Sequence, residues 1–360
     1  MWKSAALDRR AFMRAAGAGF LAALGPRSLY ALERADAVFA SGFRAPDGTY
    51  GIATVSERGE VIDRIALPAR AHGLTYCPAT GRGVAFARRP GTFAMIFDPA
   101  GRAAPVVIHS PEGRHYYGHG HFSPDGRLLY ASENDFDGNR GMIGLYDATD
   151  GFRRIGEFDA QGIGTHDMTV SDDGRYLLIA NGGIETHPDF GRTKLNLDHM
   201  EPSLVVLDAK TGHVVQRHTL PETLRQLSTR HLDIDGEGHV WFACQYEGSR
   251  NDLPPLAGYF SVGEDLTFLT LPEETTARLA NYVGAIAINR RDAIVGLASP
   301  KGGAAVLVDA KTGRVIREDS VPDAAGAAPS TDGIAVSSYR GDLAGTRSAL
   351  AWDQHMIRIA

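Results

Sequence analysis

Cysteine is scarce in this sequence, which contains only Cys77 and Cys244 among its 360 residues. Each lies in an apolar stretch, and the two stretches belong to different repeats. We therefore expect two buried thiols rather than a disulfide or a pair of metal ligands. The motif Cys-x-x-Cys-His is missing, which argues against covalently attached c-type haem.

Basic residues are not in excess either, because the formal net charge is −6. Without a basic stripe to follow a phosphate backbone, nucleic acid is not an expected partner. Beyond residue 32 no apolar run approaches the ~20 residues of a membrane helix. His-Glu-x-x-His, Gly-x-Ser-x-Gly and phosphate-binding loops are absent, so no local motif assigns a reaction.

What the sequence does contain is an internal repeat. Residues 121–127 (His-Phe-Ser-Pro-Asp-Gly-Arg) are echoed by residues 169–175 (Thr-Val-Ser-Asp-Asp-Gly-Arg), and 48 residues separate Gly126 from Gly174. Each copy joins an alternating apolar stretch to a second apolar run through a Ser-x-Asp-Gly turn, which predicts a β-hairpin. A period of about 40–50 residues with about four short strands is typical of a β-propeller.

Further echoes extend the repeat along the chain. The segments that begin at Asp147, Asp208 and Asp309 each predict a third strand that ends in an Asp-x-x-x-Gly turn. Residues 32–360 have room for about seven such units. We therefore predict an all-β fold, a single propeller of seven four-stranded blades like YVTN or WD40 propellers, closed by strands from both termini.

The first 31 residues form a segment of another kind. Arg9 and Arg10 precede Phe12, a weakly apolar stretch of small residues and Ala31. This pattern predicts a twin-arginine signal peptide over residues 1–31, with cleavage after Ala31. The mature protein is then expected in the periplasm, after export in the folded state. We also expect it to have no membrane span and to be a monomer.

Several histidines occupy equivalent positions in the aligned repeats, at the entrance of the predicted innermost strands. An imidazole there can serve a structural hydrogen bond between blades, but a group of them around one axis can bind a metal. A further histidine lies in a long insertion, between residues 181 and 203, that can cover the axis. The candidate metal ligands are His72, His119, His121, His166, His187 and His231.

Polar residues after the predicted second strands belong to the same face of the ring. They are candidates for cofactor binding, although a solvated rim would have the same composition. The residues are Arg88, Glu133, Asn181, Glu185, Gln245 and Glu247. Imidazoles with carboxylates suit Cu, Zn or Fe ions or the iron of a non-covalent haem, and the sequence does not decide among them.

Three functions remain open. The first is binding of a metal ion or of a haem or iron ligand. The second is a non-catalytic scaffold that docks a periplasmic partner. The third is a metal-dependent hydrolase with Glu133 or Glu185 as the base, although no residue stands out as a general base and an enzyme is therefore not the main expectation.

Two sequence segments stand out, Gly-His-Gly-His-Phe-Ser-Pro-Asp-Gly and Gly-Thr-His-Asp-Met. On these segments, the leader and the length, the whole chain resembles a family of exported proteobacterial propellers described as a domain of unknown function. The resemblance implies an accessory role in iron acquisition and an imelysin-like or di-haem peroxidase-like periplasmic partner. The nitrous oxide reductase propeller is similar in architecture only, because no copper-binding cupredoxin domain follows here.

Overall fold

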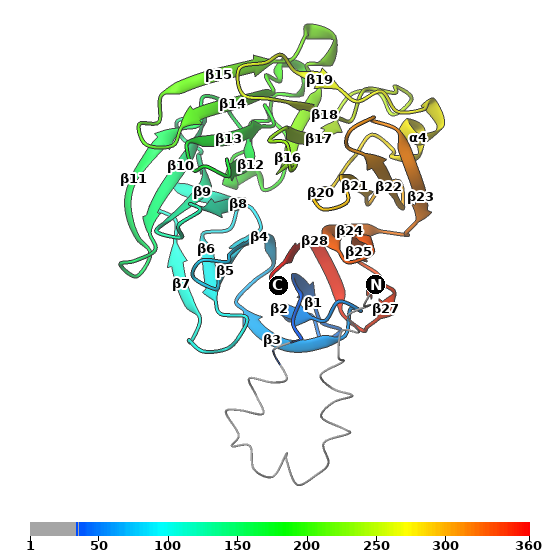
Figure 1. Cartoon of the computed structure of the whole chain (residues 1–360). Helices are drawn as coiled ribbons and strands as arrows, with labels where there is room; N and C mark the ends of the chain where they lie inside the picture. The colour runs from blue at the N-terminus through cyan, green and yellow to red at the C-terminus, as the bar shows by residue number, and fades with distance from the viewer. Residues whose placement is uncertain (1–33, 35) are drawn as a thin grey trace, which may run out of the picture.

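Seven β-sheets of four strands each stand around a central axis and form a closed ring (Figure 1). The computed structural model describes residue 34 and residues 36–360. The predicted all-β, seven-bladed propeller is therefore confirmed. The predicted signal peptide, residues 1–31, lies outside the described residues.

The blades follow one another along the chain, and each is built from its innermost strand outwards, except the first. The first blade contains β28 (Ala351–Arg358), β1 (Phe39–Arg44), β2 (Tyr50–Val55) and β3 (Val61–Leu67). The second to fourth contain β4 (Ala71–Cys77), β5 (Arg82–Ala87), β6 (Phe93–Phe97) and β7 (Val106–His109); β8 (Arg114–Phe122), β9 (Leu128–Asp135), β10 (Arg140–Asp147) and β11 (Arg153–Asp159); and β12 (Thr165–Val170), β13 (Tyr176–Asn181), β14 (Ser203–Asp208) and β15 (Val214–Thr219). The fifth to seventh contain β16 (Leu227–Ile234), β17 (Val240–Tyr246), β18 (Ala257–Phe260) and β19 (Thr267–Phe268); β20 (Ala285–Asn289), β21 (Ile294–Ser299), β22 (Ala304–Asp309) and β23 (Val315–Ser320); and β24 (Ala324–Ser330), β25 (Gly333–Ser338), β26 (Asp342–Leu343) and β27 (Thr346–Arg347).

The first blade joins the two ends of the propeller. Strand β28 pairs antiparallel with β1, in a register that sets Arg358 opposite Phe39 and Trp352 opposite Phe43. The expected closure by strands from both termini is thus present, and the C-terminal strand is the innermost one. This pairing ties the C-terminal strand to the N-terminal one and so closes the ring between the seventh and second blades.

The repeated turn motif makes the hairpins. In the third blade Ser123 Oγ donates to Asp125 Oδ1 at 2.6 Å, and Leu128 N donates back to Ser123 Oγ at 2.9 Å. Ser171 and Asp173 repeat the first of these bonds at 2.6 Å in the fourth blade. Such local bonds satisfy turn polar groups without help from distant residues, which is why the hairpins are readable from sequence.

The hydrophobic core lies between neighbouring blades. The second strands are buried along almost their whole length. Outer strands such as β15 instead consist of exposed and partly buried residues. Phe86 of the second blade packs with Tyr116 of the third in one such layer. Cys77 and Cys244 are buried free thiols in the second and fifth blades, as expected.

Little of the described chain is helical. Helix α4 (Glu273–Arg278) precedes β20, and short 3-10 turns lie at Pro188–Phe190, Leu197–His199 and Glu222–Leu224. The first two of these turns belong to the insertion at residues 182–202, which connects β13 to β14. Within the described residues no helix has the length and apolar character needed to cross a bilayer.

Candidate metal centre

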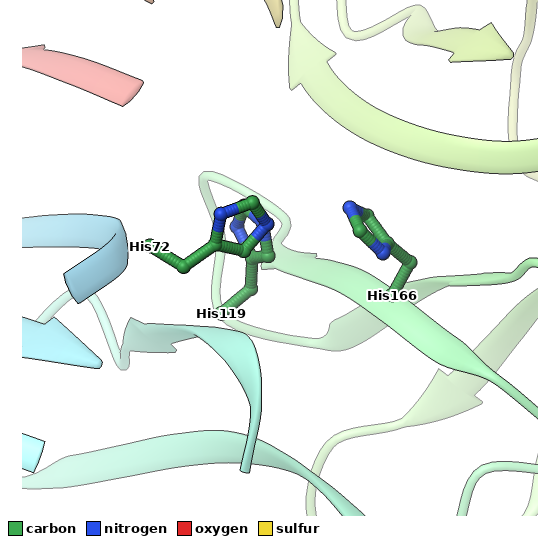
Figure 2. Close-up of side chains that lie close together, drawn as sticks. All are labelled: His72, His119 and His166. Carbon is green, nitrogen blue, oxygen red and sulfur yellow. The ribbon is translucent and has the colours of Figure 1, made fainter. Parts of the chain in front are cut away.

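Five histidines from five different blades meet on the propeller axis. We call them the axial histidine cluster, and they are His72 of β4, His119 of β8, His166 of β12, His231 of β16 and His355 of β28. Their ring centroids lie between 4.6 and 5.5 Å apart in the contacting pairs. Figure 2 shows His72, His119 and His166 turned toward one another from their separate strands.

Irregular strand pairing explains how the rings reach the axis. Each of the five inner strands has a β-bulge at or beside its histidine, for example between Thr165 and Asp167 in β12 and between Thr229 and His231 in β16. A bulge twists the strand and redirects its side chains, so that consecutive residues need not alternate between faces. His166 and Asp167, adjacent in sequence, accordingly both reach the axial site.

Two glycines make room for the rings. A Cβ on Gly118, whose φ is +111°, would lie 2.6 Å from His72 Cδ2. A Cβ on Gly73 would lie 2.6 Å from His119 Nδ1 and 2.4 Å from the Gly118 carbonyl oxygen. A larger residue at either position would therefore displace a ring of the cluster.

The cluster consists of neutral imidazoles at neutral pH. Burial lowers the pKa of His119 to about 4, against the opposing effect of the Asp167 carboxylate. Burial, together with the neighbouring histidines and cationic groups, holds the pKa of His72, His166 and His355 well below the ordinary value. The pKa of His231 is also lowered, first by burial. Neutral imidazole is the form that binds a metal ion.

Many ring nitrogens of the cluster have no hydrogen-bond partner among the described residues. They are His72 Nδ1, His119 Nε2, His166 Nε2, His231 Nδ1 and Nε2, and His355 Nε2. Two trios each offer three ligand atoms within 4.8 Å of one another, and His119 belongs to both: His72, His119 and His166; and His119, His231 and His355. Imidazole sets of this kind suit Zn, Cu, Fe or Ni.

Asp167 stands beside the cluster as its carboxylate. One oxygen lies 3.3 Å from His119 Nδ1, and the other lies 3.8 Å from His231 Nδ1. Burial alone would raise the pKa of Asp167, but the two histidines and the N–H of Leu232 hold it below its usual value. A carboxylate behind a ligating histidine fixes the ring and increases its basicity.

The cluster lies between two cavities on the axis. His119, His231 and His355 border the larger one, of about 560 Å³, which also contains Asp233. Burial raises the pKa of Asp233 to about 6 although two backbone N–H groups donate to it. His72 borders the smaller cavity, of about 280 Å³, together with His166.

Two of the predicted metal ligands lie outside the cluster. His121 borders the larger cavity, but its Nδ1 is bonded to the carbonyl of Phe122 at 2.9 Å. His187 lies in the insertion, where its ring packs against Phe136 and is 3.5 Å from Asp137 Oδ1. The structure therefore brings four of the six predicted histidines together, His72, His119, His166 and His231.

Of the six predicted cofactor-binding residues, two line the smaller cavity and a third lies beside it. Arg88 and Gln245 line the smaller cavity, and Glu247 pairs beside it with Lys194 and, at 3.4 Å, with Arg230. Glu185 lies in the insertion, where its backbone N–H donates to Asn196 at 2.8 Å.

Glu133 and Asn181 are buried inside their blades and line neither axial cavity. Glu133 accepts hydrogen bonds from Tyr146 at 2.7 Å and from Arg154 at 2.9 Å. Asn181 bonds Thr165 at 2.6 Å and the Ala160 carbonyl at 2.9 Å. Both side chains thus hold a blade together.

Sequence reasoning missed His355. No Ser-x-Asp-Gly turn accompanies β28, so the repeat alignment has no frame in which to place it. Its position in the last apolar stretch, two residues after Asp353, was the available signal. Once β28 is known to be an innermost strand, a histidine near its middle belongs with the others.

Comparison with solved structures shows the propeller fold. Hydrazine synthase from Kuenenia stuttgartiensis matches with a TM-score of 0.58 and 14% identity, over 85% of this chain and 94% of that chain. The β-propeller domain of Cps50 (Swd1) from Myceliophteria thermophila matches with a TM-score of 0.59 and 13% identity, over 85% of this chain and 91% of that one.

Sequence comparison adds a partial relative and a family. A dihydro-heme d1 dehydrogenase from Pseudomonas aeruginosa (strain PAO1) is 34% identical over 95 residues, which are 26% of this chain but 14% of that protein. A family model described as "Protein of unknown function (DUF1513)" matches residues 65–359, which include every blade except most of the first. The chain therefore belongs to the DUF1513 family.

Proposed function

We propose that the axial histidine cluster binds one transition-metal ion, Cu, Zn or Fe, and that the protein serves metal handling. The observation that carries this proposal is the set of six buried ring nitrogens that have no hydrogen-bond partner in the described part of the chain. Folded proteins leave few buried polar groups unpaired, and each such group costs about 1–3 kcal/mol. A metal ion among the rings would satisfy several of them at once.

The geometry requires only a small adjustment. Zinc–nitrogen bonds are about 2.0–2.1 Å long, so ligand atoms in a tetrahedral site are about 3.4 Å apart. The nitrogens of each trio already lie within 4.8 Å of one another. Rotation of the side chains about their χ angles can supply the difference. Asp167 would then act behind His119 as the carboxylate that orients a ligand.

An iron tetrapyrrole is the second candidate ligand. The observation that favours it is the similarity of 95 residues to a dihydro-heme d1 dehydrogenase. The rings of the cluster contact one another, which leaves no gap between them for a macrocycle. Such a ligand would have to approach through one of the two axial cavities and take a single histidine as its axial ligand.

The proposed setting is the periplasm. The twin-arginine pattern at Arg9 and Arg10 supports export of the folded protein. A role in iron acquisition, with an imelysin-like or di-haem peroxidase-like partner, follows from the family resemblance and is part of the proposal.

A metal titration tests the function. Metal-free protein would be titrated with Co²⁺, whose visible spectrum reports nitrogen ligation, and with Zn²⁺ in competition. We expect one equivalent to bind to the wild type and the affinity of His119→Gln to fall about 100-fold or more. His213→Gln, at an exposed turn, is the matched control and should bind as the wild type does. Wild-type protein that binds neither ion, while folded by circular dichroism, would reject the proposal.

A further inference from the structure

The smaller axial cavity is lined by positively charged side chains. Around its volume of about 280 Å³ lie Arg88, Arg89, Arg192, Lys194 and Arg230, above the rings of His72 and His166. No aspartate or glutamate of the described chain lines it. We call this cavity the basic chamber.

Protein carboxylates neutralise only part of this charge. Glu247 pairs with Lys194 and Arg230. Asp353, two residues before His355, instead accepts hydrogen bonds at 2.7 and 2.8 Å from Arg70, which does not line the chamber. No ion pair with a described residue neutralises Arg88, Arg89 or Arg192, and Arg88 Nε is buried without a hydrogen-bond partner there. Like charges gathered around one cavity repel one another, and more strongly where burial excludes water.

The protonation equilibria of the chamber agree with this charge excess. Burial and the surrounding arginines lower the pKa of Arg192 to about 10. Burial, followed by Arg230, lowers the pKa of Arg89, and burial lowers that of Lys194. A lowered pKa of a cation means that its charged form is disfavoured, and a bound anion would reverse this.

The remaining lining provides neutral hydrogen-bond donors. Three tyrosines, Tyr117, Tyr282 and Tyr339, and the amides of Gln245 and Gln354 border the chamber. Guanidinium groups present planar pairs of N–H donors that match the oxygens of carboxylate and phosphate. The chamber thus combines several charges with several donors around a volume near the lower limit for a small-molecule site.

The insertion supplies two of the five cations. Arg192 and Lys194 lie between β13 and β14, in residues 182–202. Asn196 fastens the base of this loop, because its Nδ2 donates to the Gly183 carbonyl at 2.9 Å and its Oδ1 accepts from Glu185 N at 2.8 Å. The loop therefore brings positive charge over the chamber from a fixed base.

We propose that the basic chamber binds a small oxyanion with at least two negative charges, of the polycarboxylate or phosphate class, directly above His72 and His166. Arg88, Arg89 and Arg192, which form no ion pair with a described residue, provide the charge, and the tyrosines and glutamines provide the remaining bonds. This site goes beyond the proposed metal site and does not require it, because the cations and donors are present without a metal.

Calorimetric titration of metal-free protein tests the proposal. The protein is freed of metal on a chelating resin, because a soluble chelator such as EDTA is itself a polycarboxylate. The probes are propane-1,2,3-tricarboxylate, which chelates metals weakly, inorganic phosphate, and acetate as the monovalent control. We expect one multivalent probe to bind in a 1:1 ratio with an affinity that falls as salt is raised, and acetate to bind far more weakly.

Two variants locate the site. Arg192→Gln should weaken binding about tenfold or more, since it removes a charged hydrogen-bond donor from the chamber. Arg217→Gln removes the same charge from an exposed outer strand and should leave binding within about twofold of wild type. Preference for the tricarboxylate or for phosphate identifies the class. No binding of either probe at millimolar concentration, or an equal loss in both variants, would overturn the proposal.

The metal and anion sites can fail separately. If Co²⁺ binds but neither anion does, the chamber proposal is wrong and the metal proposal stands. If an anion binds to protein that takes up no Co²⁺ or Zn²⁺, the metal proposal is wrong and the chamber proposal stands.

Discussion

The histidines of the axis differ from ordinary buried histidines in what surrounds them. His115, for comparison, is buried with both ring nitrogens bonded, one to the Tyr116 carbonyl and one to Asn134. The axial rings instead face one another. Within the described chain, six of their ring nitrogens have no hydrogen-bond partner. A histidine with a structural role resembles His115, so the axial set calls for a ligand.

The role of Asp167 can be tested by substitution. Asp167→Asn keeps the shape of the side chain but removes the charge next to His119 and His231. We expect metal affinity to fall about 10–100-fold with the fold intact, measured by Co²⁺ titration and circular dichroism. Asp265→Asn, at an exposed site, is the control. Unchanged affinity in Asp167→Asn would remove Asp167 from the site.

At the scale of the element, the recurrent turns hold each blade. In three blades the third strand ends at an aspartate, Asp147, Asp208 or Asp309, whose carboxylate accepts bonds from a threonine of the following turn. The hydroxyl bond and the backbone N–H bonds lower the pKa of each of these carboxyls. Hydrogen bonds from Ser123 and Ser171 lower the pKa of the Asp125 and Asp173 carboxyls in the same way.

These turns predict how stability responds to acid. A carboxyl whose pKa is lower in the folded than in the unfolded state stabilises the fold above the unfolded value of about 4, and this contribution is lost as pH falls below it. The denaturant midpoint should therefore fall between pH 5 and pH 3. In the double variant Asp125→Asn and Asp173→Asn, the denaturant midpoint should fall less over the same pH range than in the wild type. An identical pH profile for the variant would contradict this role of the turns.

The same turns explain how much could be read from the sequence. The hairpins were predicted because Ser123, Asp125 and their equivalents bond within a few residues of each other. Glu133 and Asn181 were expected at the axial face, but which way a strand residue points depends on register, and a shift of one residue reverses it. His355 was missed because its neighbours in space lie more than 100 residues away in sequence.

At the scale of the whole molecule, the ring depends on one pairing of distant segments. Strand β28 closes the first blade and also supplies His355, so ring closure and the completion of the axial cluster are one event. Trp352 of this strand is fully buried against Phe39 and Phe43, and its Nε1 donates to the Gly341 carbonyl at 3.1 Å.

This closure can be tested with Trp352→Ala. Loss of a buried tryptophan typically costs about 3–5 kcal/mol, so we expect a decrease of that size in the free energy of unfolding. Ile316 lies on an outer strand and is 52% exposed, so the control Ile316→Ala should change stability by less than about 0.5 kcal/mol. Equal effects of the two substitutions would show that β28 does not determine closure.

Locating a bound metal ion would test the axial metal centre directly. Crystals of metal-loaded protein would be measured at the absorption edge of the metal, and its position read from the anomalous difference map. We expect one peak on the axis, within about 2.0–2.3 Å of nitrogens from at least three histidines of the axial cluster. A peak only at surface histidines, such as His187 or His213, with the axial rings unoccupied, would contradict it.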